Sequence, residues 1–162
     1  MVKNSAANEL RERYKAGERD FAGMDLSFTD LNHLNLKGAN FSRAILEGAN
    51  LSRTNLRFAD FSGTHLEGAD LTGADLLYAK LRRAKLNDAQ LVEAVLRSAN
   101  LTDASLLGAN LSDADLLGTK MPDGCLLTAG NSAKLAKYTT DSTLDSHKSI
   151  SIFNLFKLFI PG

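Results

Sequence analysis

Apolar residues recur at every fifth position through the middle of the chain. Of the 22 positions from 21 to 126 taken at five-residue steps, 18 are Leu, three are Phe and one is Met121. Two residues before each of them, 14 of 22 are Ala; one residue before, 13 are Asp or Asn. Two residues after them stand eight of the chain's 12 glycines. The repeated unit is therefore Ala-(Asp/Asn)-Leu-x-(Gly/x).

Neither an α-helix nor a plain strand has this period. A five-residue step turns an α-helix by about 500°, so the leucines would spiral around it without forming a stripe. In a strand the same step places each leucine on the opposite face. The pattern fits a short extended segment followed by a turn, in which Ala and Leu point inward and Asp or Asn points outward. Glycine two residues after Leu suits a turn position with positive φ.

A second spacing indicates how many units close one coil. Phe21, Phe41 and Phe61 recur at every fourth unit, and the outward residues Phe58 and Tyr78 are separated by the same interval. Four units per coil would place each set in one column, with a rise of about 4.8 Å per coil. Residues 19–128 hold 22 units, or 5.5 coils. The pattern thus predicts an all-β solenoid.

The segments ANFSR, ANLSR, ADFSG, ADLTG, ANLTD and ANLSD resemble the pentapeptide-repeat family, A(D/N)LXX. The lead-in YKAGERDF is similar to the entry into the repeats in bacterial members, including cyanobacterial ones. The resemblance covers residues 19–128 and implies a right-handed quadrilateral β-helix. It also implies one specific alternative function, because some relatives are DNA mimics that bind a type II topoisomerase.

Both ends of a solenoid need a cover, since the terminal coils expose apolar side chains and unpaired backbone. Residues 1–18 are expected to form an N-terminal capping helix over 6–16, with Ser5 as N-cap and Gly17 as terminator. Residues 129–162 are expected to hold a short helix at 131–138, a polar linker and an apolar tail. The tail residues are Ile152, Phe153, Phe156 and Phe159. They could cover the rod, form a homodimer or partner interface, or touch a membrane surface.

Composition excludes several classes of protein. Lys plus Arg and Asp plus Glu are both 19, so the net charge is zero and strong nonspecific binding of nucleic acid is not expected. A single cysteine, Cys125, allows no intrachain disulfide and suits the cytoplasm. The N-terminal segment MVKNSAANELRERYK lacks the apolar part of a secretory signal. The longest apolar stretch, 149–162, is shorter than the roughly 20 residues of a transmembrane helix.

Motifs of catalysis are not found in the sequence. The histidines His33, His65 and His147 are expected at the surface, and neither metal-ligand spacing nor a glycine-rich phosphate loop occurs. The Asp and Asn column, such as Asp30 and Asn50, is expected to bond to turn backbone instead of forming a metal ladder. We therefore predict no enzyme activity, no cofactor and no metal.

The outward positions that vary are where a partner would bind. Basic residues gather in the middle of the repeats, and exposed aromatic residues lie near them. The predicted partner-binding residues are Arg43, Arg53, Arg57, Phe58, Tyr78, Lys80, Arg82, Arg83 and Lys85. Further apolar groups are expected to point outward at Leu77, Leu107, Leu117 and Leu127. The preferred function is a noncatalytic protein–protein interaction, with an unidentified partner, or a structural scaffold built on the rigid rod. As a docking patch, the basic residues would favour an acidic partner. DNA mimicry is disfavoured by the zero net charge.

Overall fold

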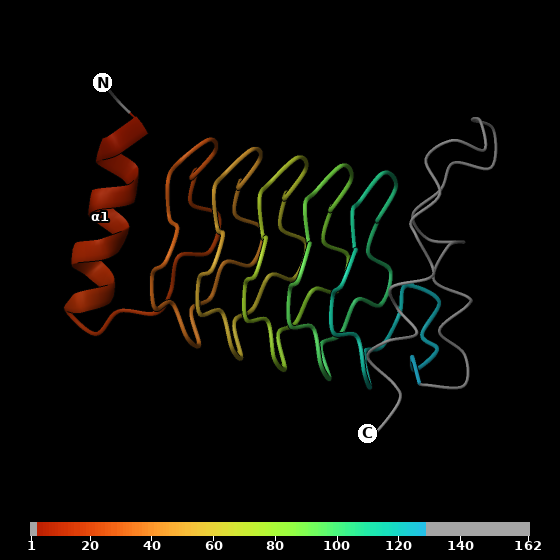
Figure 1. Cartoon of the computed structure of the whole chain (residues 1–162). Helices are drawn as coiled ribbons and strands as arrows, with labels where there is room; N and C mark the ends of the chain where they lie inside the picture. The colour runs from red at the N-terminus through yellow and green to blue at the C-terminus, as the bar shows by residue number, and fades with distance from the viewer. Residues whose placement is uncertain (1–2, 129–162) are drawn as a thin grey trace.

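The computed structural model describes residues 3–128, which form a rod of stacked coils with a helix across its N-terminal end (Figure 1). The helix, α1, comprises Lys3–Lys15. The expected helix at 131–138 and the tail residues Ile152, Phe153, Phe156 and Phe159 lie outside the described residues. In the described part, no helix combines the length and apolar character needed to cross a membrane.

Each coil takes four repeat units, as the column spacing predicts. Isolated parallel bridges join equivalent positions of successive coils, beginning with Asp20 to Asn40 and ending with Asn100 to Lys120. The bridges form four rows, one for each unit of the coil. We name the sides of the rod by their first residues: side 1 holds 19–23, side 2 holds 24–28, side 3 holds 29–33 and side 4 holds 34–38, each with the residues at the same positions in later coils.

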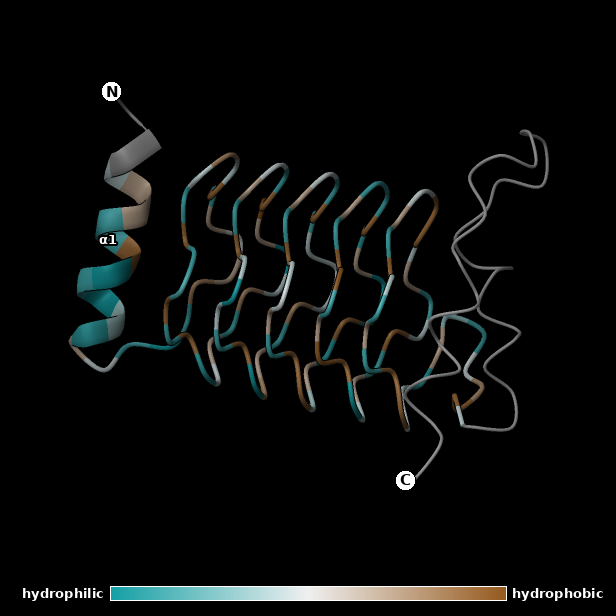
Figure 2. Ribbon diagram, viewed as in Figure 1, coloured by the Kyte–Doolittle hydropathy of each residue, from teal (hydrophilic) through white to brown (hydrophobic). Residues whose placement is uncertain are grey.

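The interior is a set of apolar columns. The Leu, Phe and Met side chains at the five-residue positions are buried from Phe21 to Met121, and the alanines two residues earlier complete the core. Phe21, Phe41 and Phe61 stack in one column, with ring centroids 5.6 and 5.3 Å apart. Apolar and polar positions alternate around every coil, as Figure 2 shows. The two-residue spacing of Ala and Leu thus places both on the inner face.

The turn position two residues after the inward side chain has a left-handed backbone from Gly23 to Gly118. Twelve non-glycine residues adopt it, with φ between 53° and 61°, alongside glycines. The Asp or Asn before the turn stabilises it: in Asp60, for example, Oδ1 accepts the backbone N–H of Ser62 at 2.9 Å. Asp30, Asn50, Asp70 and Asn110 make the same contact. The expected bond from these side chains to turn backbone is confirmed.

Helix α1 lies over the first coil. Its Ala7 and Leu10 side chains are buried, and the Tyr14 hydroxyl donates a hydrogen bond to the Lys37 carbonyl at 2.9 Å. The helix ends in a Schellman motif, because Glu18 N–H binds the Arg13 carbonyl and Gly17 N–H binds the Tyr14 carbonyl. The helix begins earlier than predicted, at Lys3, so Ser5 lies inside the helix and is not its N-cap.

The last unit departs from the predicted register. Leu126 was expected inside and Leu127 outside, but Leu126 is 57% exposed and Leu127 is buried. The cause is a longer turn, in which the positive φ falls on Gly124 instead of the preceding residue. The chain then runs back, with an antiparallel bridge between Lys120 and Leu126. A shift of one residue exchanges the inner and outer faces of an extended segment.

Candidate interaction surface

Two aromatic side chains stack on the edge between sides 4 and 1. Phe58 and Tyr78 occupy the same turn position in successive coils, and their ring centroids are 5.3 Å apart at 17° between planes. They are 50% and 52% exposed. Left-handed backbone costs a residue with a Cβ about 1–2 kcal/mol, whereas such a stack contributes about 0.5–1.5 kcal/mol. The pair therefore adds little to folding and presents a flat apolar surface, the aromatic ridge, to solvent.

Cationic side chains flank the aromatic ridge. The Lys37 ammonium lies 5.6 Å from the centroid of the Phe58 ring. Arg57 Nη1 is 3.7 Å from Asp75 Oδ2, and Lys80 Nζ is 3.3 Å from Asp60 Oδ2. Exposed ion pairs of this kind are worth only about 0–1 kcal/mol. A carboxylate of a bound partner could therefore compete for these cations at little cost.

Charge divides the rod lengthwise. In residues 19–128 sides 1 and 4 carry nine of the 11 basic residues and six of the 14 acidic ones, whereas sides 2 and 3 carry two basic and eight acidic residues. The basic residues on sides 1 and 4 are Arg19, Lys37, Arg43, Arg57, Lys80, Arg82, Arg83, Arg97 and Lys120. The sequence count alone, a net charge of zero, hides this division because it does not say which side each residue occupies.

The fold separates the predicted partner-binding residues. Seven of the nine lie on sides 1 and 4, but Arg53 lies on side 3 and Lys85 on side 2, where its Nζ is 4.0 Å from Glu67 Oε1. Sharing a coil does not make residues neighbours, since each five-residue step moves to another side. On the edge between sides 1 and 2, Arg83 Nε lies 3.6 Å from Asp103 Oδ2.

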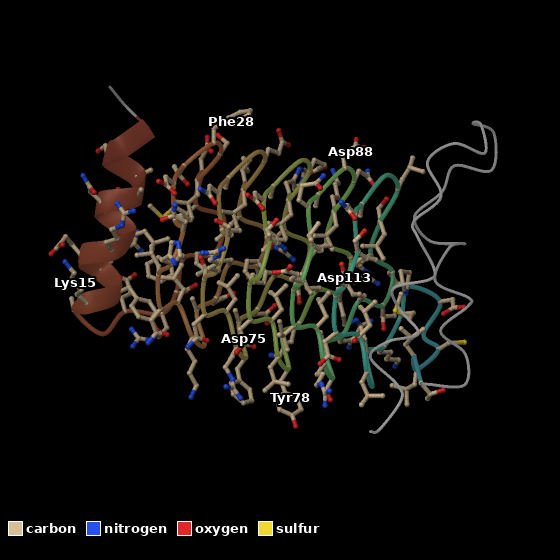
Figure 3. The ribbon with its side chains drawn as sticks, in the orientation of Figure 1. Lys15, Phe28, Asp75, Tyr78, Asp88 and Asp113 are labelled. Atoms are coloured by element: carbon tan, nitrogen blue, oxygen red, sulfur yellow. The ribbon has the colours of Figure 1, made fainter. Side chains whose placement is uncertain are left out.

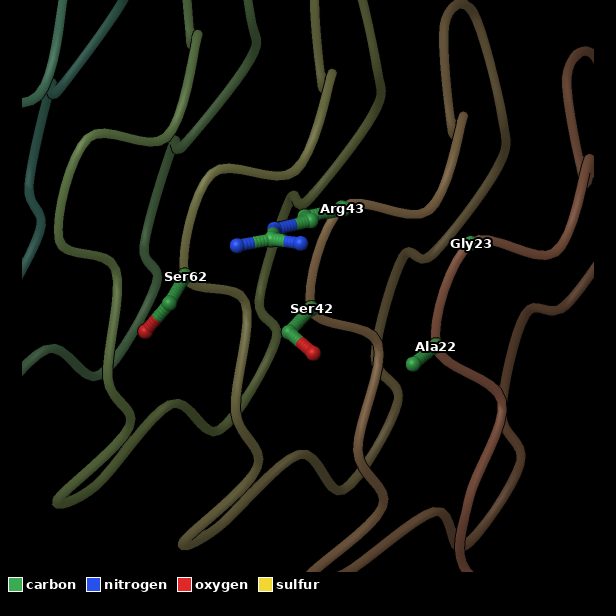
Figure 4. A pocket seen from close by; sticks show the side chains of 5 residues that line it. All are labelled: Ala22, Gly23, Ser42, Arg43 and Ser62. Atoms are coloured by element: carbon green, nitrogen blue, oxygen red, sulfur yellow. The ribbon is translucent and has the colours of Figure 1, made fainter.

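An open hollow of about 460 Å³ lies on side 1 (Figure 4). Its lining is Ala22, Gly23, Ser42, Arg43 and Ser62. The position directly after the inward residue holds a small side chain in three successive coils: Ala22, Ser42 and Ser62. In the fourth coil the same position holds Arg82. The hollow combines two hydroxyls with a guanidinium, groups that bind a carboxylate. The sequence prediction missed the hollow; comparing the equivalent positions 22, 42 and 62 of successive coils would have found it.

Among residues 3–128, side 2 brings together three groups that could hold a metal ion. Glu47, His65 and Glu67 each place one possible ligand atom within 4.8 Å of the others. The sequence prediction expected His65 at the surface and no metal ligands, because no short motif links these residues. Glu47 and Glu67 occupy equivalent positions in successive coils, so the coil register was the available signal.

The sequence matches a family model described as pentapeptide repeats (8 copies), over residues 19–48, 49–88 and 89–126. These ranges make up two thirds of the chain. The chain is a pentapeptide-repeat protein. No curated protein matches it.

Solved structures of other pentapeptide-repeat proteins resemble this one. Rfr23 from the cyanobacterium Cyanothece 51142 is 27% identical, with 75% of this chain and 99% of that chain covered and a TM-score of 0.45. HetL, involved in heterocyst differentiation regulation in the cyanobacterium Nostoc sp. PCC 7120, is 32% identical, with coverage of 67% and 60% and a TM-score of 0.39. Trypsin-treated QnrB1, a plasmid-mediated fluoroquinolone resistance protein, is 29% identical, with coverage of 63% and 57% and a TM-score of 0.28.

Proposed function

We propose that this pentapeptide-repeat protein is a noncatalytic scaffold, a right-handed quadrilateral β-helix that binds an acidic protein partner on sides 1 and 4. The observation that carries the proposal is the aromatic ridge, formed by Phe58 and Tyr78 on the edge between the two basic sides. Tyr and Arg are among the residues that most often dominate binding energy at protein interfaces, and Phe is also enriched there.

The surroundings of the aromatic ridge support an acidic partner. Lys37, Arg57 and Lys80 lie around it, and the hollow lined by Ser42, Arg43 and Ser62 lies on side 1. A partner segment with an apolar residue between carboxylates could place the apolar group on the rings and the carboxylates on the cations. Charge complementarity of this kind raises the association rate and selects the partner.

The packing of the rod favours binding over catalysis. Its interior is filled by the apolar columns, and the four buried polar residues of the described part, Thr29, Thr54, Thr64 and Thr119, donate their hydroxyls to backbone carbonyls. The ionisable groups therefore lie on outward-facing sides, where water reaches them. We place the protein in the cytoplasm, where a single exposed cysteine, Cys125, stays reduced.

An affinity pull-down from the host tests the proposal. The double variant Phe58→Ala/Tyr78→Ala should lose a protein that the wild type captures. The matched control is Phe28→Ala, which removes an exposed aromatic ring at the same turn position on the opposite edge of the rod (Figure 3). Equal capture by the double variant and the wild type would contradict the proposal.

Salt provides a second test of the charged contacts. Capture should weaken as the salt concentration rises from about 0.1 M to 1 M, because the Debye length, over which charges interact, falls from about 10 Å to 3 Å.

The acidic surface of sides 2 and 3 favours DNA mimicry as a second function. In residues 19–128 these two sides hold eight acidic residues and two basic ones. The basic sides 1 and 4 oppose this function, so it is our second candidate. A supercoiling assay with a bacterial type II topoisomerase distinguishes the two: the scaffold proposal expects no inhibition at micromolar protein, and inhibition would support mimicry.

The apolar tail is proposed as a second interface. Its residues Ile152, Phe153, Phe156 and Phe159 would join two copies of the chain. Light scattering on the full chain and on a form ending at Lys148 measures this directly. A dimer mass that falls to a monomer mass on truncation supports the interface, whereas equal masses in both refute it.

A further inference from the structure

The cluster of Glu47, His65 and Glu67 joins two neighbouring coils on side 2. Glu47 follows Leu46 in one coil, and His65 and Glu67 flank Leu66 in the next. His65 Nδ1 is 3.5 Å from Glu47 Oε1 and 3.8 Å from Glu67 Oε1. In a tetrahedral zinc site, bonds of about 2.0–2.2 Å separate neighbouring ligand atoms by about 3.3–3.6 Å. The three side chains are therefore close to the spacing of ligands around one ion.

A second observation concerns the Glu67 carboxylate. Its Oε2 atom is buried and has no hydrogen-bond partner among the described residues. The Glu67 side chain as a whole is 30% exposed, and the distances to His65 and Lys85 are to its other oxygen, Oε1. A buried carboxylate oxygen without a partner costs free energy, which a cation bound by both oxygens of Glu67 would recover. Glu47 and Glu67 also occupy the same position in adjacent coils, about 4.8 Å apart along the rod, so their charges repel each other. A cation between them would remove that repulsion.

We propose that Glu47, His65 and Glu67 bind one zinc ion, which links the two coils. Imidazole nitrogen and carboxylate oxygen are ordinary zinc ligands, and water would complete a tetrahedral shell. The ion binds the unprotonated Nδ1 of His65, Oε1 of Glu47 and the carboxylate of Glu67, whose Oε1 faces His65 and whose Oε2 has no other partner among the described residues. Its role is to hold the coils together, because the three protein ligands come from two coils that otherwise meet through backbone bridges such as Ile45 to His65.

Lys85 provides an internal test of the site. Its Nζ lies 4.0 Å from Glu67 Oε1, so its charge opposes a bound cation. Exposed pairs of this kind are worth up to about 1 kcal/mol. Replacing Lys85 with Gln should therefore tighten zinc binding by about two- to fivefold.

Calorimetric titration of the full chain with zinc chloride at pH 7.5 tests the proposal. The wild type should bind one zinc ion at this site, and His65→Ala and Glu67→Gln should each weaken binding at least about tenfold. Glu67→Gln changes a single oxygen to an NH2 group of similar size, so it alters the ligand with little change in packing. The matched controls are His33→Ala, an exposed histidine on side 3, and Cys125→Ser, which removes the free thiol; both should leave this binding unchanged.

Cobalt gives an independent readout of geometry. Co²⁺ bound in place of zinc should give the intense visible absorption of a tetrahedral centre, and His65→Ala should abolish it. The wild type should also melt at a higher temperature in excess zinc, because an ion that binds only the folded state stabilises it. Zinc binding that is absent from the wild type, or that persists unchanged in His65→Ala, would overturn the proposal.

Discussion

At the scale of the residue, the repeat fixes the backbone and leaves the side chain to vary. From Gly23 to Gly118 the turn position has positive φ, whether glycine or a residue with a Cβ occupies it. Phe58, Tyr78 and Arg43 adopt this backbone at a cost of about 1–2 kcal/mol each. These three outward side chains are therefore held against a local preference, which glycine at the same positions would avoid.

Glycine-to-alanine substitutions can separate backbone cost from steric cost. Gly38 and Gly48 both have positive φ, but a Cβ at Gly38 would meet nothing within 4 Å, whereas one at Gly48 would lie 2.6 Å from the Phe28 ring. Gly38→Ala should lower the free energy of unfolding by about 1–2 kcal/mol. Gly48→Ala should lower it further, because the ring must also move. Urea unfolding monitored by circular dichroism measures both.

A double variant provides the control for this comparison. In a Phe28→Ala background, Gly48→Ala should cost no more than Gly38→Ala does in the wild type, since the ring is gone. If Gly48→Ala costs the same with and without the Phe28 ring, the steric explanation is wrong and the backbone term accounts for the whole effect.

Acid stability should depend on Asp60. Burial raises the pKa of its carboxyl, but hydrogen bonds from the Ser62 hydroxyl and backbone N–H and from Lys80 outweigh burial, so the pKa lies below its usual value. A carboxyl with a lowered folded pKa stabilises the protein above its unfolded pKa of about 3.9, and this contribution is lost as the pH falls through the folded pKa. Asp60→Asn removes the titration and keeps an oxygen for Ser62 N–H.

The expected result is a flatter dependence of stability on pH in the variant. Urea midpoints measured from pH 6 down to pH 2 should fall less for Asp60→Asn than for the wild type. The same column already holds Asn40, whose Oδ1 accepts the Ser42 N–H at 3.0 Å, so the turn tolerates the amide. Parallel pH curves for the two proteins would show that Asp60 contributes nothing to acid stability.

At the scale of the element, the five-residue pattern predicted most of the inner columns and the turns correctly. It failed where the turn length changed: Gly124 takes the left-handed position one residue late, and Leu126 and Leu127 exchange faces. The pattern also could not show that Glu47, His65 and Glu67 lie together on side 2. The coil register assigns each residue to a column. Contacts between columns, such as His65 to Glu47, depend in addition on side-chain conformation, which sequence spacing does not encode.

The phenylalanine column gives a prediction at this scale. Phe41 stacks on both Phe21 and Phe61, whereas the column continues with Leu81 beyond Phe61. Phe41→Leu loses two aromatic contacts and Phe61→Leu loses one. The first should therefore be more destabilising by about 0.5–1.5 kcal/mol, the worth of one aromatic pair beyond its buried area. Guanidinium unfolding of both variants measures the difference; a larger loss for Phe61→Leu would contradict the pairwise account.

At the scale of the whole molecule, each coil depends on its neighbours. A solenoid coil buries its apolar side chains only against the adjacent coils, so stability is close to a sum of nearest-neighbour terms. Helix α1 supplies the missing neighbour of the first coil through Ala7, Leu10 and Tyr14. The division into basic and acidic sides is superimposed on this stack, because outward residues are free of the packing that fixes the columns.

A charge placed in the middle of a column should interrupt the rod. Leu71 is fully buried on side 3, and its column neighbours are Leu51 and Leu91. Leu71→Ala should cost about 2–5 kcal/mol, and Leu71→Asp should cost more because it buries an unpaired polar group as well. Since both flanking coils lose their contact at once, we expect Leu71→Asp to abolish the cooperative melt followed by circular dichroism.

Leu107→Asp, the same change at an exposed outward leucine, is the matched control and should melt like the wild type. A wild-type melt for Leu71→Asp would mean that the columns do not hold the coils together.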